Sequence, residues 1–204
     1  MFGRRSCATL DAAHAVSHHN TRLQAAVQRT FAEANNAILK LVAYNALCAA
    51  EITYAGMSFF VIASQALHND MIAHAMRALD EHRDAASFWY VKRCNEQVTA
   101  AAARAAGVDL SALKSTSEKL RYIREKTHFH VDRQAVLNPS QVWEAAGVTG
   151  DEFKDSLHAV ASVMSGVEVG LFGGEPLVVT EYDGSDVNRI VKSYEHIRGH
   201  VHGI

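Results

Sequence analysis

Helical spacing of apolar residues, with almost no proline to interrupt it, is the feature that most constrains this fold. The chain of 204 residues has only two prolines, and 49% of its residues are hydrophobic. From about Thr21 to Ala55, small and mostly apolar residues recur every three or four positions, as in an amphipathic helix. They are Leu23, Val27, Phe31, Ala34, Ile38, Leu41, Val42, Asn45 and Ala49. We therefore predict an all-α protein.

The same spacing predicts further helices over residues 58–79, 86–106, 111–132, 139–147, 149–166 and 186–198. The polar pair Asn35–Asn36 interrupts the apolar pattern of the first helix, which is still expected to be one long helix. Gly107 is expected to end the third predicted helix as a left-handed cap, and Thr149 with Glu152 forms a capping box. Residues 177–182 are strand-like in composition but have no partner strand, so we expect an extended segment.

Three consecutive parts are expected within one helical domain. Residues 1–20 are polar and form an N-terminal arm, residues 21–135 form a helical bundle, and residues 136–204 form a C-terminal helical extension packed on the same domain. No apolar run reaches the length of about eighteen residues that a membrane span needs. We therefore expect no membrane partner. The three cysteines are far apart and suggest no disulfide framework, so we expect a cytoplasmic protein.

Two side chains that could take part in catalysis or binding are expected to contribute to packing instead. His74 lies beside the apolar stripe of the second predicted helix, where a buried histidine bonded to a neighbouring carbonyl is the simplest interpretation. Trp89, at the start of the third predicted helix, is expected to pack in the core rather than to stack on a nucleic-acid base.

Charge is concentrated in one region of an otherwise balanced chain. The formal net charge of −2 and the pI near 6.6 argue against binding of nucleic acid over the whole surface. Between residues 114 and 133, however, six lysines and arginines face three acidic residues. This predicts a small positive patch on the helix over 111–132, although such a patch often forms only a solvated helix face.

The segment from Arg121 to Asp132 is the densest in titratable groups. At roughly 100° per residue, an apolar stripe runs along one side of the predicted helix; it consists of Leu113, Leu120, Ile123, Thr127 and Val131. Arg124 and His130 lie at the two edges of this stripe. On a straight helix, Arg121, His128 and Asp132 point to the opposite side.

Arg124 and His130 are the candidate catalytic residues. A guanidinium carries a permanent charge and donates a fork of hydrogen bonds that suits a phosphodiester and its transition state. An imidazole titrates near neutral pH, so it can move a proton to or from a ribose hydroxyl or a leaving oxygen. Together the two groups suffice for RNA cleavage through the 2′-hydroxyl without a metal ion. The alternative from the same residues is a structural ion pair of Arg124 with Glu125 or Asp132 and a packed boundary residue at His130.

The run Arg-Glu-Lys-Thr-His-Phe-His-Val-Asp at residues 124–132 resembles the signature of HEPN domains, an arginine followed after four to six residues by a histidine. Within that superfamily it is most similar to the AbiU-like abortive-infection branch, whose motif reads approximately Arg-Asn-Lys, three residues, His, one residue, Asp. A second similarity is the sequence Met-Arg-Ala-Leu-Asp at 76–80, followed by Ala-Ser-Phe at 86–88. The resemblance covers residues 20–135.

This resemblance implies an all-α bundle of the HEPN type that forms a homodimer, and in active relatives an endoribonuclease. By position, Arg124 would contact phosphate and His130 would be the acid or base, with Lys126 and Asp132 orienting them; Arg121 and His128 would assist substrate binding. No cofactor is implied, and the candidate partners are RNA and a cognate antitoxin or another protein.

Two departures from the family pattern affect this expectation. Glu125 follows the arginine, where active members commonly have Asn, Asp or His, and Phe129 replaces a small residue. Many members of the superfamily are also non-catalytic. A non-catalytic dimer that binds RNA, a nucleotide or a protein is therefore the alternative function.

Metal sites are the remaining alternative. His128, His130 and Asp132 have the spacing of a metallohydrolase run, but residues two apart on a helix diverge by about 200°. The pair His196 and His200 has helical metal-binding spacing without an evident third ligand. We expect no metal.

Overall fold

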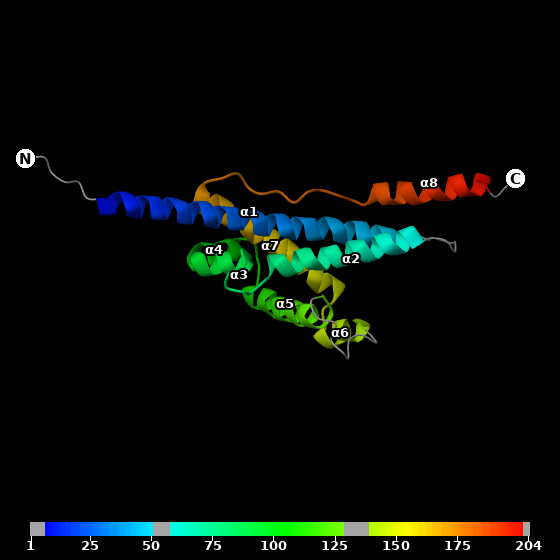
Figure 1. The fold of residues 1–204 in the computed structure, drawn as a ribbon, viewed down its shortest axis with the longest axis horizontal. Helices are drawn as coiled ribbons and strands as arrows, with labels where there is room; N and C mark the ends of the chain where they lie inside the picture. The colour runs from blue at the N-terminus through cyan, green and yellow to red at the C-terminus, as the bar shows by residue number, and fades with distance from the viewer. Residues whose placement is uncertain (1–6, 51–57, 129–138, 202–204) are drawn as a thin grey trace, which may run out of the picture.

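The computed structural model describes residues 7–50, 58–128 and 139–201 (Figure 1). Within these ranges the chain forms eight α-helices and one π-helical turn and no strand, which confirms the all-α class for the described residues. The elements are α1 (Cys7–Ala49), α2 (Ser58–Ala78), α3 (Phe88–Cys94), α4 (Glu96–Ala105), α5 (Leu110–Ile123), η1 (Arg124–His128), α6 (Pro139–Ala146), α7 (Gly150–Phe172) and α8 (Ser185–Val201).

The long helix α1 organises the arrangement of the others. It lies along the longest axis of the molecule, with α2 and α7 packed against it and α8 beside its C-terminal half (Figure 1). It begins at Cys7, so the prediction that the first helix starts near Thr21, after a polar arm, is wrong for residues 7–20. This segment contains four alanines and neither glycine nor proline, so nothing local opposes its helical extension.

One hydrophobic core joins residues from both halves of the chain. Fully buried side chains come from α1, α2, α5 and α7, among them Val27, Ile72, Leu120, Leu157 and Val163. Helix α7 therefore contributes to the same core as the helices before residue 135. No helix among the described residues combines the length and apolar character needed to span a bilayer.

The third predicted helix is interrupted. Asn95 leaves helical geometry, with φ −148° and ψ 79°, and separates α3 from α4. Its side-chain oxygen accepts a hydrogen bond from the Val98 amide at 3.2 Å, so it caps the new helix. The predicted glycine cap is confirmed, since Gly107 has a φ of 68°.

Helix α7 begins as predicted but ends later. The Thr149 hydroxyl accepts a hydrogen bond from the Glu152 amide at 3.1 Å, as expected of the capping box. The predicted end at Gly166 is wrong, because α7 continues to Phe172 and ends at Gly173 in the left-handed conformation. A Cβ atom at Gly166 would lie 3.0 Å from the Ala102 Cβ, so this glycine allows α4 and α7 to approach closely.

The motif helix is shorter than predicted. Leu113, Leu120 and Ile123 are buried, which confirms the first part of the apolar stripe. The α-helical geometry ends at Ile123, and Arg124–His128 form a π-helical turn instead of continuing a straight α-helix to Asp132. A π turn changes the direction in which later side chains point, so positions derived from a straight helix do not apply beyond Ile123.

An extended segment connects α7 to α8 along α1, and residues 177–182 form no strand, as predicted. Asn35 holds this segment, because its Oδ1 accepts a hydrogen bond from the Thr180 amide at 2.8 Å and its Nδ2 donates to the Thr180 hydroxyl at 3.1 Å. Helix α1 continues through Asn35–Asn36, which confirms the expectation of one long helix, so the polar pair does not interrupt the backbone. The polar side chain binds another part of the chain instead.

Candidate functional site

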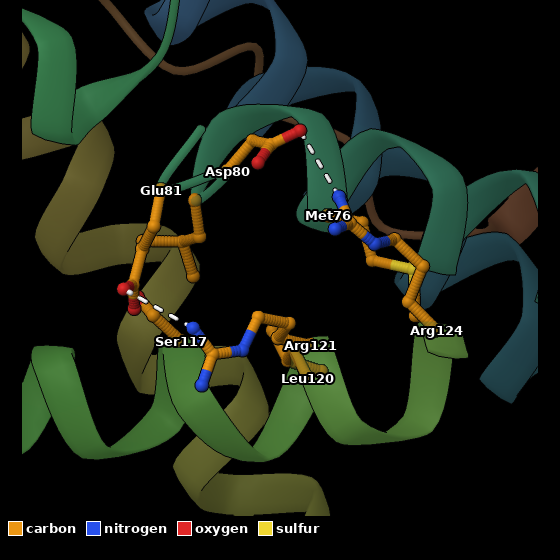
Figure 2. A pocket seen from close by; sticks show the side chains of 8 residues that line it. Met76, Asp80, Glu81, Ser117, Leu120, Arg121 and Arg124 are labelled. Atoms are coloured by element: carbon orange, nitrogen blue, oxygen red, sulfur yellow. Dashed lines mark hydrogen bonds and ion pairs between the residues drawn. The ribbon is translucent and has the colours of Figure 1, made fainter. Parts of the chain in front are cut away.

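Arg124 meets an acidic residue from the end of α2. Its Nη1 donates to the Asp80 Oδ2 at 3.0 Å, and both side chains are about three-quarters buried (Figure 2). The other Asp80 oxygen accepts from the His82 amide at 2.9 Å, while the Asp80 carbonyl accepts from the hydroxyl of buried Ser87. The turn after α2 therefore fixes the carboxylate that holds the guanidinium at the end of α5.

Glu81 contacts two further cations of α5. Its Oε2 pairs with the Lys114 ammonium and lies 3.8 Å from the Arg121 guanidinium. Its other oxygen is buried and has no hydrogen-bond partner among the described residues. The recess enclosed by these groups, with Met76, Leu79, Asp80, Glu81, Ser117, Leu120, Arg121 and Arg124 in its lining, has room for about one water molecule. The recess is therefore too small for a nucleotide.

The structure describes part of the predicted site. Arg124 is partly buried and Arg121 exposed, as the helical pattern predicted, and Lys126 is also partly buried. His128 ends η1. His130 and Asp132, together with the metal alternative that needs them, lie outside the described residues. Convergence of Arg124 with His130 therefore stays a prediction.

The positive charge of the motif helix is offset by acids from other elements. Besides the pairs with Asp80 and Glu81, the Lys119 ammonium contacts both oxygens of Glu152 in α7, at 2.8 and 3.0 Å. The hydrogen bond from Lys119 lowers the pKa of Glu152 below its ordinary 4.5 despite partial burial. The balance of basic and acidic residues within 114–133 did not include these acids, because they belong to distant segments. Only the acidic pair directly after the second predicted helix hinted at such partners.

A second ionic cluster joins α1 to α2. Glu33 is buried, and its Oε2 lies 2.5 Å from the His74 Nδ1 and accepts from the Arg77 Nε at 2.9 Å. Its Oε1 pairs with the Arg29 guanidinium at 2.5 Å. Burial raises the pKa of Glu33, but the hydrogen bonds from His74 and Arg77 and their charges outweigh it, so the pKa lies below the ordinary 4.5. The prediction that His74 bonds to a neighbouring carbonyl is therefore wrong. Its partner is the carboxylate of Glu33 in α1.

This arrangement offers a positioned, partly exposed guanidinium beside a π turn, the kind of irregularity often found at functional sites. It suits contact with a phosphate, while the small recess gives no sign of an enclosed cofactor site. Comparisons of the chain with known protein families, with curated proteins and with solved structures give no significant match.

Proposed function

We propose that this protein is a metal-independent endoribonuclease of the HEPN type that cleaves RNA through the 2′-hydroxyl. The observation that carries the proposal is the contact of Arg124 with Asp80 at 3.0 Å. Asp80 belongs to the segment 76–80 and Arg124 to the segment 124–132, on both of which the resemblance rests, and the described parts of the two segments meet at this contact. The cellular setting, a cytoplasmic toxin or phage-defence component, rests on the resemblance alone.

In this mechanism Arg124 binds the scissile phosphate and stabilises the charge that develops on it. Asp80 orients the guanidinium from behind, as a fixed carboxylate orients a catalytic cation or imidazole elsewhere. His130 moves the proton between the 2′-hydroxyl and the leaving oxygen. A homodimer, as the resemblance implies, brings Arg124 and His130 of both copies to one site.

Cleavage of a mixed RNA substrate in EDTA tests the proposal. We expect the wild type to leave 2′,3′-cyclic phosphate ends and His130→Ala to lose at least about 100-fold in rate, the usual contribution of an acid or base. His158→Ala is the matched control, because His158 is a half-buried histidine of α7 that does not line the recess at Arg124. Equal cleavage by wild type and His130→Ala, or no cleavage by either, would contradict the enzymatic role.

The non-catalytic HEPN-like dimer remains the second candidate. It is favoured by the neutralisation of the motif helix, in which Lys114, Lys119, Arg121 and Arg124 each pair with a carboxylate. In this case Arg124 is a structural partner of Asp80. RNA or protein binding without cleavage, unchanged by His130→Ala, would support it.

A further inference from the structure

Three cations surround a hollow that adjoins the candidate site. The hollow has a volume of about 470 Å³ and is lined by Lys92 and Arg93 of α3, Lys114 of α5, Glu81, Trp89, Leu110 and Ser111. We call this the basic hollow. Ligand sites for small molecules commonly measure about 300–1,000 Å³, so the space suffices for a nucleotide unit, in contrast to the recess at Arg124.

The charge of the basic hollow is only partly offset. Lys114 pairs with Glu81 and lies 3.7 Å from Glu118, and Lys92 donates to Glu96 at 2.9 Å. The Arg93 guanidinium donates to the carbonyls of His82 and Arg83, at 3.5 and 3.3 Å. No carboxylate among the described residues lies within 4.0 Å of Arg93. Because Lys92 and Lys114 have carboxylate partners whereas Arg93 donates to carbonyls only, Arg93 is the cation of the hollow best placed to bind an anionic ligand.

The basic hollow and the recess at Arg124 share one wall. Glu81 lines both spaces and contacts Lys114 on one side and Arg121 on the other. The ten positions from Lys114 to Arg124 correspond to about 15 Å of helix. An RNA strand held at Arg124 must therefore extend beyond the phosphate bound there to reach the hollow.

Other spaces in the described residues suit RNA less well. The groove between α5 and α7 is lined by Asp109, Glu152 and Asp155, whose charges repel phosphate. The buried Trp89 directs its indole N–H to the Ser117 hydroxyl at 2.9 Å, while the Lys114 ammonium lies 5.3 Å from its ring centroid. The ring face is therefore occupied by a cation, and the hollow fits a phosphate better than a stacked base.

We propose that the basic hollow binds backbone phosphates of single-stranded RNA, on the part of the strand that continues from the phosphate at Arg124. This inference rests on the proposed function and adds the surface that holds the substrate strand. Arg93 and Lys92 contact phosphate directly from α3. Lys114 provides a third charge from α5 and exchanges Glu81 for phosphate when the strand is bound.

Binding of 2′-O-methyl RNA, which cannot be cleaved through the 2′-hydroxyl, tests the hollow separately from the reaction. Fluorescence anisotropy of an eight-nucleotide and a three-nucleotide strand is measured on the full chain at several salt concentrations. For the longer strand, the double variant Lys92→Gln, Arg93→Gln is expected to reduce the slope of log Kd against log salt by about 1.4, since each lost phosphate contact removes about 0.7. The shorter strand, bound at Arg124, should be unaffected.

Three further variants complete the test. Ser111→Glu adds a negative charge to the hollow at an exposed position in the first turn of α5, where a carboxylate suits the helix dipole, and it should weaken binding of the longer strand. Lys154→Gln removes an exposed cation from α7 and is the matched control. Trp143→Phe leaves Trp89 as the one tryptophan of the chain, so its fluorescence should change on binding the longer strand only.

The outcomes separate the hollow from the ribonuclease. The slope of log Kd against log salt could be the same in the double variant, the Lys154→Gln control and the wild type. That result would contradict phosphate binding by the basic hollow, even if the protein cleaves RNA. An equal loss for short and long strands would contradict its position relative to Arg124. Binding that depends on Arg93 without cleavage in EDTA would support the hollow and reject the ribonuclease. If the wild type binds neither strand, the proposal that the basic hollow binds RNA is wrong.

Discussion

At the scale of single residues, Glu33 shows how a charge inside this protein is held. Its side chain is only 4% exposed, yet it contacts His74, Arg77 and Arg29. A buried carboxylate is costly unless cations and donors satisfy it, and here they come from two helices. The cluster therefore ties α1 to α2 at one defined register.

Glu33→Gln should destabilise the protein by roughly 1–3 kcal/mol at neutral pH, because a neutral amide replaces the acceptor of charge-assisted hydrogen bonds. Urea denaturation followed by circular dichroism measures the change. Glu96→Gln is the control, since its ion pair with Lys92 is exposed and worth about 0–1 kcal/mol. Equal stability of both variants would mean that the Glu33 cluster contributes nothing beyond a surface pair.

At the scale of elements, the contact between α4 and α7 depends on small residues. Gly166 faces Ala102, and a Cβ atom added at Gly170 would lie 3.2 Å from the Val98 Cγ1. Glycine in a helix interior is unfavourable by itself, so the close approach of the two helices must compensate for it. The glycines that suggested the end of a helix are thus packing positions.

Gly166→Leu should lower the free energy of unfolding by about 1–3 kcal/mol, because the added side chain must push α4 away from α7. Ser162→Leu, at an exposed position of the same helix, adds a similar volume without a clash and should change stability by less than about 0.5 kcal/mol. Thermal unfolding of both variants measures the difference. A neutral Gly166→Leu would show that the helices are not packed at this distance.

At the scale of the whole molecule, ion pairs connect helices that are distant in sequence. Glu33 links α1 with α2, Asp80 links the end of α2 with the end of α5, and Glu152 links α7 with α5. Each carboxylate pairs with at least one cation from another element. The packing of the bundle is therefore coupled to the ionisation of these acids.

Acid should unfold the protein through these pairs. The pKa values of Glu33 and Glu152 are below the ordinary 4.5 in the folded chain, so the unfolded chain binds protons first as the pH falls. Their contribution to stability is complete above about pH 5 and is lost as the pH falls through the lowered pKa values. Urea denaturation at a series of pH values should show this decline, and the double variant Glu33→Gln, Glu152→Gln should show a shallower one. Parallel curves would contradict the linkage.

Local features of the fold could be predicted from the sequence, whereas the partners in the candidate site could not. The cap at Thr149, the left-handed Gly107 and the buried stripe of Leu113, Leu120 and Ile123 follow from spacing and residue type. Asp80, the partner of Arg124, lies 44 positions earlier in the chain. Helical periodicity relates residues within a few turns and carries no information over such a separation.

The sequence by itself determined that this chain is helical and that Arg124 lies at the edge of an apolar stripe, because both depend on the period of one helix. The tertiary structure alone decided that Asp80 fixes this arginine, that Glu33 joins α1 to α2, and that α7 passes Gly166 without ending. These outcomes depend on which helices meet and how closely. Ion pairing and steric fit between segments that are distant in sequence determine these features, and no single segment contains that information.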